Sequence, residues 1–252
     1  MKPILIANWK MNLGLHVAVH EAKNIHKRAV EGVELVICPS FTAFSELQRM
    51  LPELTLGAQN MHYESAGNFT GEVSVTQVKR FAQYVIIGHS ERRQYNHEDD
   101  TIINQKVKSA LAHDLVPVLA VGENLEERKA GQTQKVIREQ LEKDLRDCRI
   151  TEETEMVIAY EPVWAISGKD ISRVATSEEI QKVADLIKEL LVSRFGSGAK
   201  SIRIIYGGST NAKNCREIFE IENISGSLVG SASLEARSFI KIAKILRGVK
   251  NV

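Results

Sequence analysis

Short apolar runs rich in β-branched residues recur along the whole chain, and this recurrence constrains the fold more than any other feature. Several runs are apolar throughout rather than alternating, which is typical of parallel strands that are covered by helices. The first of the eight runs starts at residue 4 and the last starts at residue 227. The seven intervals between successive starts therefore average about 32 residues, which is the size of a strand–helix unit. The runs begin at Ile4, Glu34, Leu54, Tyr84, Val116, Met156, Ser201 and Ser227.

The segments between these runs have helical spacing and capping signals. Residues 176–196 begin with a Thr-Ser pair followed by acidic residues and end at a glycine, as helices often do. Residues 98–114 and 124–147 show the same pattern, and the second segment is interrupted near Gly131.

Eight strand–helix units in 252 residues predict an α/β chain with one domain over residues 1–252, a (β/α)8 barrel. No linker or low-complexity tract divides the chain. A doubly wound open sheet is the alternative, because periodicity does not detect closure of a sheet.

The composition excludes several classes of partner. Lys and Arg number 33 and Asp and Glu number 32, so there is no general electrostatic attraction to nucleic acid or to an anionic membrane. No apolar stretch approaches the roughly 20 residues of a membrane span, and the start lacks a signal peptide. Three widely spaced cysteines fit neither a disulfide framework nor a zinc site. We therefore expect a cytoplasmic protein with reduced thiols.

Polar residues that strands rarely bury follow the C-terminal ends of the predicted strands. In a barrel these ends converge on one face, where active sites are built. Residues far apart in the sequence would then line one pocket. The residues concerned are Asn8, Lys10, Gln59, Asn60, His89, Ser90, Glu91, Glu123, Glu161, the Gly-Gly-Ser turn at 207–209, and Gly230 with Ser231.

Each of these residues also has an ordinary structural explanation. A lysine after a strand is usually a solvated strand end, and a single histidine such as His89 is more often structural or exposed. His16 and His20 have metal-like spacing on a predicted helix, but a surface pair is favoured because no further ligand is near. Glu161 precedes a proline, which disfavours helical geometry and suits a strand end of either kind.

The two glycine-containing turns, at 207–209 and 230–231, are weak phosphate signals singly. Together they follow the last two predicted strands, where barrels often bind phosphate through backbone N–H groups. The sequence contains no Walker loop, GxGxxG, HExxH or CxxC motif.

Six segments, in order from residue 8 to residue 234, resemble the triosephosphate isomerase family. They are NWKMN, AQN with FTGE, GHSERR, AYEPVWAI, YGGS and LVGSASL. The resemblance implies a (β/α)8 barrel that interconverts dihydroxyacetone phosphate and D-glyceraldehyde 3-phosphate in glycolysis and gluconeogenesis. It also implies that neither a metal nor an organic cofactor takes part.

The resemblance implies a catalytic role for three residues. Glu161 is expected to move a proton between two substrate carbons, and His89 to donate hydrogen bonds to the substrate oxygens. Lys10 supplies positive charge near the phosphate and the developing enediolate. The chemistry requires these types, because the base must work near neutral pH and a negatively charged oxygen needs preorganised donors.

The resemblance extends to substrate-binding and supporting residues. Asn8 and Trp9 lie beside Lys10 in the substrate-binding segment, and Glu91 and Glu123 are the expected supporting acids. The phosphate is expected to be held largely by main-chain N–H groups, at Ser167, Ser209, Gly230 and Ser231.

The segment AISGKDISRVAT departs from the family's usual pattern. Residues 162–164 resemble the hinge of a mobile lid, but eight residues separate Ile166 from Ala175, more than is usual. Ser167 replaces the first lid glycine, and it can still donate its N–H if its backbone geometry permits.

The segment 61–72 resembles the loop by which family members reach into a partner subunit. Thr70 is expected to insert near Lys10 and His89 of the partner subunit, so the resemblance implies a homodimer. The predicted ligand is a small phosphorylated triose.

Two other functions are alternatives to an active isomerase. A barrel that binds without turnover predicts loss of Lys10, His89 or Glu161, and all three are present. A different phosphosugar isomerase would share the phosphate turns but not GHSERR together with YEPVW. Fold analogy alone does not separate these alternatives.

Overall fold

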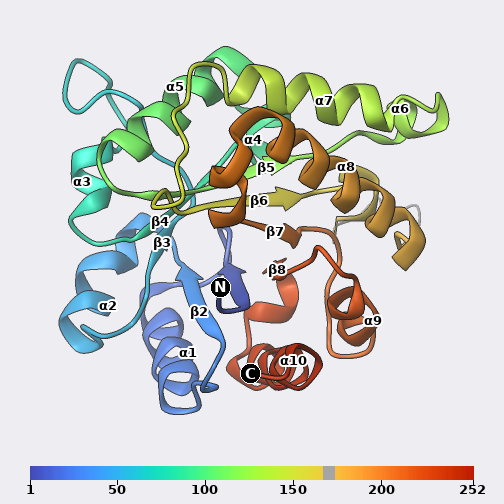
Figure 1. Ribbon diagram of the computed structural model, residues 1–252. Coiled ribbons are helices and arrows are strands. Elements are labelled where there is room, and N and C mark those ends of the chain that lie inside the picture. The colour runs from blue at the N-terminus through green and yellow to red at the C-terminus, as the bar shows by residue number, and fades with distance from the viewer. Residues whose placement is uncertain (167–173) are drawn as a thin grey trace.

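All eight predicted strands form in the computed structural model, which describes residues 1–166 and 174–252. They are parallel and belong to one sheet, in the order β2-β1-β8-β7-β6-β5-β4-β3. Figure 1 shows the strands surrounded by helices. The strands are β1 (Ile4–Asn8), β2 (Glu34–Cys38), β3 (Gly57–Ala58), β4 (Tyr84–Ile87), β5 (Val116–Val121), β6 (Met156–Tyr160), β7 (Ile202–Tyr206) and β8 (Gly226–Val229).

The two ends of this sheet meet, which gives a nearly closed barrel rather than the open doubly wound alternative. Ile37 of β2 forms a parallel bridge with Leu56, just before β3, and its N–H donates to the Thr55 carbonyl at 3.0 Å. The chain is a single barrel domain, so the predicted architecture is confirmed.

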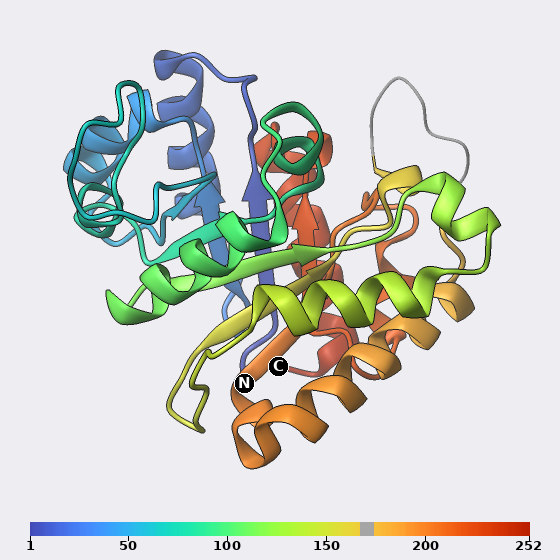
Figure 2. The same ribbon diagram turned by 90° about the horizontal axis from the view of Figure 1, so that it is seen from above.

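Ten α-helices connect the strands in the described part of the chain and cover the outside of the barrel, as the view from above shows (Figure 2). Four short 3₁₀ segments accompany them: η1 (Phe41–Ala43), η2 (Val163–Ala165), η3 (Gly196–Ser201) and η4 (Ser231–Ser233). The α-helices are α1 (Leu15–Lys27), α2 (Phe44–Met50), α3 (Val75–Lys79), α4 (Ser90–Tyr95), α5 (Asp100–Ala112), α6 (Leu125–Lys129), α7 (Thr133–Asp144), α8 (Ser177–Phe195), α9 (Cys215–Glu220) and α10 (Ala236–Lys250).

The capping signals mark the helix boundaries as predicted. Thr176 and Glu179 form a capping box that starts α8, and Gly196 follows its last residue. The segment 124–147 splits into α6 and α7, and Gly131 between them has a positive φ of 70°. The glycine therefore makes the turn that separates the two helices.

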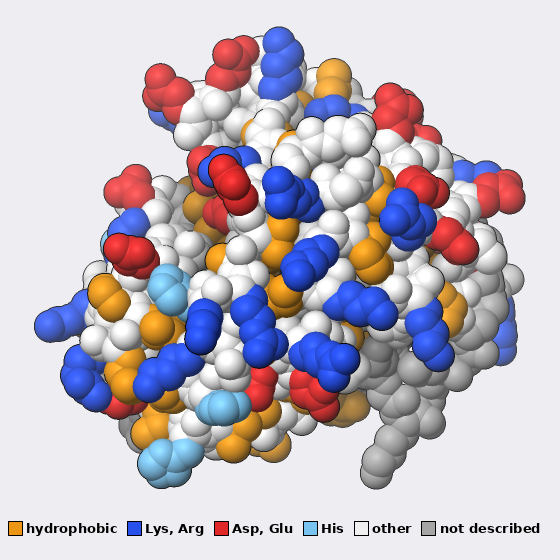
Figure 3. Space-filling model, turned by 90° about the horizontal axis from the view of Figure 1, so that it is seen from below, with side chains coloured by type: hydrophobic (Ala, Val, Ile, Leu, Met, Phe, Trp, Pro, Cys, Tyr) orange, Lys and Arg blue, Asp and Glu red, His pale blue; other side chains and the backbone are white. Residues whose placement is uncertain are grey.

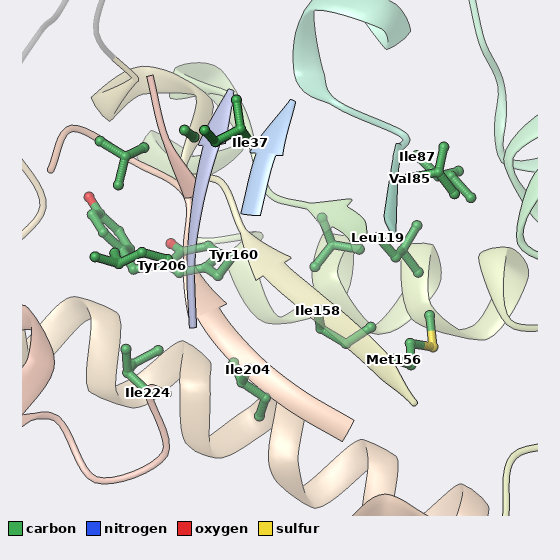
Figure 4. Packing of buried hydrophobic residues seen from close by; sticks show 14 of the residues in the cluster. Ile37, Val85, Ile87, Leu119, Met156, Ile158, Tyr160, Ile204, Tyr206 and Ile224 are labelled. Atoms are coloured by element: carbon green, nitrogen blue, oxygen red, sulfur yellow. The ribbon is translucent and has the colours of Figure 1, made fainter. Parts of the chain in front are cut away.

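Alternation along the strands divides the core into two layers. One set of side chains meets the helices outside the barrel, and Figure 4 shows part of it, including Ile87, Leu119 and Tyr160. The other set contains buried residues from the strands alone and fills the barrel interior; Ile6 and Val118 belong to it. Because both faces are covered, the strands are apolar throughout, which is the pattern seen in the sequence.

The nearly balanced charge of the chain is not spread evenly over its surface. Helix α10 carries five cationic residues and no acidic one, and Figure 3 shows many Lys and Arg side chains on the face of the molecule seen from below. None of these α10 residues lines the pocket at the strand ends. The described segments contain no helix long and apolar enough to cross a membrane.

Candidate active site

The C-terminal ends of the strands surround a cavity of about 230 Å³. Seven of the residues predicted from the sequence line it: Asn8, Lys10, His89, Glu91, Glu161, Gly230 and Ser231. A larger cavity of about 420 Å³ lies beside Glu161 but does not include Lys10 or His89 among its described lining residues. The smaller cavity is the candidate active site, because a carboxylate, an imidazole and an ammonium group line it together.

Glu161 follows β6 directly and is almost completely buried, with 2% of its surface exposed. Its Oε2 accepts the Ser90 N–H at 3.2 Å, and its Oε1 lies 3.3 Å from His89 Nε2. Oε1 has no hydrogen-bond partner within the described part of the chain. Because Glu161 lines the cavity, this oxygen is available to a ligand there.

The space for Glu161 depends on a glycine after β7. A Cβ atom on Gly207 would lie 2.5 Å from Glu161 Cγ, closer than real Cβ contacts. Gly207 and Gly208 also line the cavity. The first glycine of the 207–209 turn therefore makes room for the carboxylate, a role that residue type and spacing alone do not indicate.

His89 is held with its Nε2 toward the cavity. Its Nδ1 accepts the Glu91 N–H at 3.2 Å, at the start of α4. A nitrogen that accepts a hydrogen bond carries no proton, so the proton of a neutral ring is on Nε2. The imidazole is therefore arranged as a donor toward a ligand in the cavity.

Lys10 has a left-handed backbone with φ 49°, which is uncommon for a residue with a side chain. The Asn8 Oδ1 accepts the Lys10 N–H at 3.0 Å, and Gln59 Nε2 donates to the Lys10 carbonyl at 2.9 Å. Lys10 Nζ contacts Glu91 Oε1 at 2.6 Å. Asn8 and Gln59 hold the Lys10 backbone, and the Glu91 carboxylate pairs with its ammonium group at the cavity wall.

Glu123 is fully buried beneath the segment that follows Glu161. It accepts hydrogen bonds from Trp164 Nε1 at 3.0 Å and from the Tyr160 hydroxyl at 3.2 Å. Burial, reinforced by the Glu123 carboxylate, raises the pKa of Tyr160, so the hydroxyl stays protonated and donates. Glu123 thus anchors both flanks of Glu161 without reaching the cavity.

The predicted phosphate residues are divided between the cavity wall and its surroundings. Gly230 and Ser231 line the cavity at the start of η4, where the first N–H groups of a helical turn lack partners within that turn. The Ser209 N–H donates to the Ala165 carbonyl at 2.9 Å, and its own carbonyl accepts from Asn214. Ser209 lies in the turn beyond the two cavity-lining glycines.

Two further predicted residues, Trp9 and Thr70, are not part of the cavity wall. The Trp9 side chain is buried and its Nε1 donates to the Ser233 carbonyl at 3.0 Å, which ties the β1 end to η4. Thr70 is exposed in the segment between β3 and α3. Ser167 lies outside the described residues.

Some residues of the site carried no catalytic signal in the sequence. Asn12 lines the cavity and donates to the Trp9 carbonyl at 2.8 Å. Gln59 was noticed after a strand, but only the structure shows that it holds Lys10. The apolar part of the wall comes from Ile166, Leu228 and Leu234.

Metal ligation has no support in the described residues. No group of three or more His, Cys, Asp or Glu residues there could hold a metal ion. His20 is exposed and contacts Asn24 at 3.0 Å, which fits the surface pair favoured over a metal site. The three cysteines are unpaired.

Comparison with known proteins identifies the same family along nearly the whole chain. The family model of triosephosphate isomerase matches residues 3–246. The triosephosphate isomerase of Alkaliphilus metalliredigens is 43% identical over 246 residues, covering 96% of this chain and 98% of the relative. That of Carboxydothermus hydrogenoformans is 42% identical over 252 residues, with the same coverage.

A solved structure extends the similarity to three dimensions. The crystal structure of triosephosphate isomerase from Bartonella henselae superimposes with a TM-score of 0.89 at 37% sequence identity. The match covers 98% of this chain and 100% of that one.

Proposed function

The chain belongs to the triosephosphate isomerase family, and from that premise we propose how its own side chains carry the reaction. It is an isomerase that interconverts dihydroxyacetone phosphate and D-glyceraldehyde 3-phosphate through an enediolate, a step of glycolysis. Residues 1–252 act as one unit in this proposal.

Glu161 is the base. Its Oε1 removes a proton from the carbon next to the substrate carbonyl, and the C–H electron pair forms the carbon–carbon double bond of the enediolate. The carbonyl oxygen takes the negative charge. The hydroxyl proton passes from one oxygen of the enediolate to the other, which forms the new carbonyl, and the same carboxyl group returns the carbon proton to the neighbouring carbon. No net redox change occurs. The single observation that best supports this role is that Glu161 is buried and that its Oε1 has no hydrogen-bond partner among the described residues.

His89 and Lys10 stabilise the charge that this transfer creates. The Nε2–H of His89 donates to the substrate oxygens on either carbon as the charge moves between them. Lys10 Nζ faces the same cavity and offsets the charge of both the enediolate and the phosphate. Because both groups are fixed before substrate arrives, little reorganisation accompanies the step.

The phosphate is bound at the ends of β7 and β8. Gly230 and Ser231 line the cavity and would donate their N–H groups to the phosphate, and Asn8 supports Lys10 in the same cavity. Ser167 and Ser209 complete the proposed set; the Ser209 N–H donates to the Ala165 carbonyl in this structure, so it would have to exchange that partner for the phosphate. Trp9 contributes by fixing the β1 end against η4.

We further propose that the enzyme is a cytoplasmic homodimer. The segment between β3 and α3 extends from the barrel (Figure 1), and its residues 64–72 are exposed. In the dimer, Thr70 would reach the cavity of the partner subunit and close its open side near Lys10 and His89 of the partner subunit.

A steady-state assay of glyceraldehyde 3-phosphate turnover, coupled to a reductase, tests the assigned roles. The His89→Asn variant keeps a side chain that can cap α4 but withdraws the donor from the cavity. We expect its kcat to fall by about 10²-fold or more, as loss of an oxyanion donor does. A wild-type kcat in this variant would contradict the role of His89.

A further inference from the structure

Arg93, on α4, ties together the two strand ends beside His89. Its Nε donates to the Gly88 carbonyl at 2.9 Å and its Nη2 to the Ala120 carbonyl at 3.4 Å. Gly88 immediately precedes His89 and has a positive φ of 72°. The guanidinium therefore holds the peptide that aims His89 into the cavity.

The other side of this guanidinium is bound by two carboxylates from the outer helices. Nη1 donates to Asp100 Oδ1 at 2.7 Å, and Nη2 donates to Asp144 Oδ2 at 2.7 Å. Asp144 ends α7 and is completely buried. Its Oδ1 has no hydrogen-bond partner within the described residues.

Burial of the Asp144 carboxylate is energetically unfavourable. A charged carboxylate in the interior loses its hydration, and one at the C-terminal end of a helix also faces the negative end of the helix dipole. Packing alone would be satisfied by an apolar residue of similar size. Among the described residues the carboxylate pairs with the Arg93 guanidinium, two hydrogen bonds away from the His89 peptide, and it also lies against the Asp100 carboxyl.

We propose that Asp144 is a positioning residue for His89, acting through Arg93. The ionised carboxylate fixes the guanidinium, which fixes the Gly88 and Ala120 carbonyls, and these set the direction of the imidazole. This inference rests on the proposed role of His89 and adds to it a residue of α7 that does not touch the cavity.

The charge of Asp144 changes within the range in which the enzyme can be assayed. Burial raises the pKa of Asp144 to about 7; the Arg93 guanidinium lowers it and the nearby Asp100 carboxyl raises it further. Lys143 contacts Asp100 at 3.3 Å and partly offsets its charge. Other titratable or charged groups near this end of α7 in the described part of the chain include Lys108 of α5, Asp147, Cys148 and Arg194 of α8.

Protonation weakens the hold on Arg93, because a neutral carboxyl accepts a weaker hydrogen bond from a guanidinium than a carboxylate does. Above pH 7 the ionised Asp144 carboxylate holds the Arg93 guanidinium in place. Below pH 7 this carboxylate is protonated, so one of the two carboxyl groups that contact Arg93 loses its negative charge. Turnover should therefore contain a component that falls as the pH drops through 7.

The test compares kcat of the wild type with that of Asp144→Asn at saturating substrate between pH 5.5 and 8.5. Asparagine imitates the protonated carboxyl at every pH. We expect the wild type to exceed the variant by at least about threefold at pH 8.5, and the ratio to approach one at pH 5.5, with similar KM values. The ratio cancels titrations common to both proteins, including that of the substrate phosphate.

Asp147→Asn is the matched control, since this nearby carboxylate is exposed and contacts Lys108 instead of Arg93. The ratio of the wild-type kcat to the Asp147→Asn kcat should stay near one from pH 5.5 to pH 8.5. A wild-type to Asp144→Asn ratio that does not change with pH, or an equal change in Asp147→Asn, would overturn the proposal.

A second measurement needs no variant and applies even if Asp144→Asn does not fold. The Arg93 Nε–H signal of the wild type, followed by NMR, should shift with a midpoint near pH 7. A constant signal from pH 5.5 to 8.5 would overturn the proposal. The His89→Asn variant separates the two hypotheses. If this variant keeps full kcat, the proposed role of His89 is wrong. If it is impaired but the ratio of wild-type to Asp144→Asn kcat does not change with pH, only the proposed role of Asp144 is wrong.

Discussion

The Glu161 carboxylate and the His89 imidazole face each other across the cavity, with 3.3 Å between Oε1 and Nε2. They come from the ends of β6 and β4, and the Ser90 N–H occupies the other carboxylate oxygen. A base and a donor at this separation can both contact adjacent atoms of a small substrate. The fold creates this pair, because parallel strands of a barrel end on the same face.

Gly207→Ala should impair the base without contacting the substrate. The added Cβ would lie 2.5 Å from Glu161 Cγ, so the carboxylate must move. A displacement of about 1 Å can lower kcat about 10²-fold, and the circular dichroism spectrum should stay unchanged. Gly14→Ala is the control, because a Cβ there meets no atom within 4 Å. Equal kcat values for the two variants would contradict the packing role of Gly207.

The sequence predicted the barrel because each element carried its own signal. Strands that are apolar throughout indicate a sheet that is buried on both faces. Capping residues such as Thr176 mark where helices begin. β3 is the exception, since only Gly57 and Ala58 pair as a regular strand within the longer apolar run that begins at Leu54. Pairing lengths depend on the neighbouring strands and cannot be read from one run.

The candidate site was predicted in part, through position after strands and through family resemblance. Lys10, His89 and Glu161 do line one cavity. Contacts between distant segments were not predictable, because the type of a residue does not indicate which distant side chain it contacts in the fold. Gln59 on the Lys10 carbonyl and Asp144 on Arg93 are contacts of this kind.

Lys10→Met should weaken substrate binding and turnover together. Methionine keeps most of the side-chain length but removes the charge near the phosphate and leaves Glu91 without its 2.6 Å partner. We expect kcat/KM to fall by at least about 10²-fold, as expected when a charged partner is removed from a desolvated site. Substrate-dependence curves measure both effects, and an unchanged KM and kcat would remove Lys10 from the site.

The stability of the protein should carry the signature of Asp144. Its pKa is raised from 3.8 to about 7, so between these values the folded state binds a proton that the unfolded state does not. The contribution of Asp144 to the free energy of unfolding is therefore fully present below pH 3.8 and is lost as the pH rises to 7. The total loss is about 4 kcal/mol.

Asp144→Asn lacks this titration. The difference in unfolding free energy between the variant and the wild type should increase by about 1.4 kcal/mol per pH unit between pH 5 and 7. Urea unfolding at several pH values measures it. A difference that is constant across this range would show that burial of Asp144 has no such effect.

Dilution should lower activity if Thr70 completes the cavity of the partner subunit. We expect specific activity to fall as analytical ultracentrifugation shows the shift from dimer to monomer, because each subunit then loses the loop near Lys10 and His89. Thr70→Ala should change the activity of the dimer little by comparison, since its backbone remains. A fully active monomer would contradict the proposed assembly.

The central claim is that Glu161 transfers the proton, and hydrogen exchange tests it most directly. Dihydroxyacetone phosphate is incubated in D₂O with the wild type or with Glu161→Gln, and deuterium at the carbon next to the carbonyl is followed by NMR. The account predicts rapid incorporation with the wild type and, with the variant, substrate binding but exchange slower by at least about 10³-fold. Exchange at the wild-type rate in Glu161→Gln would mean that another group is the base.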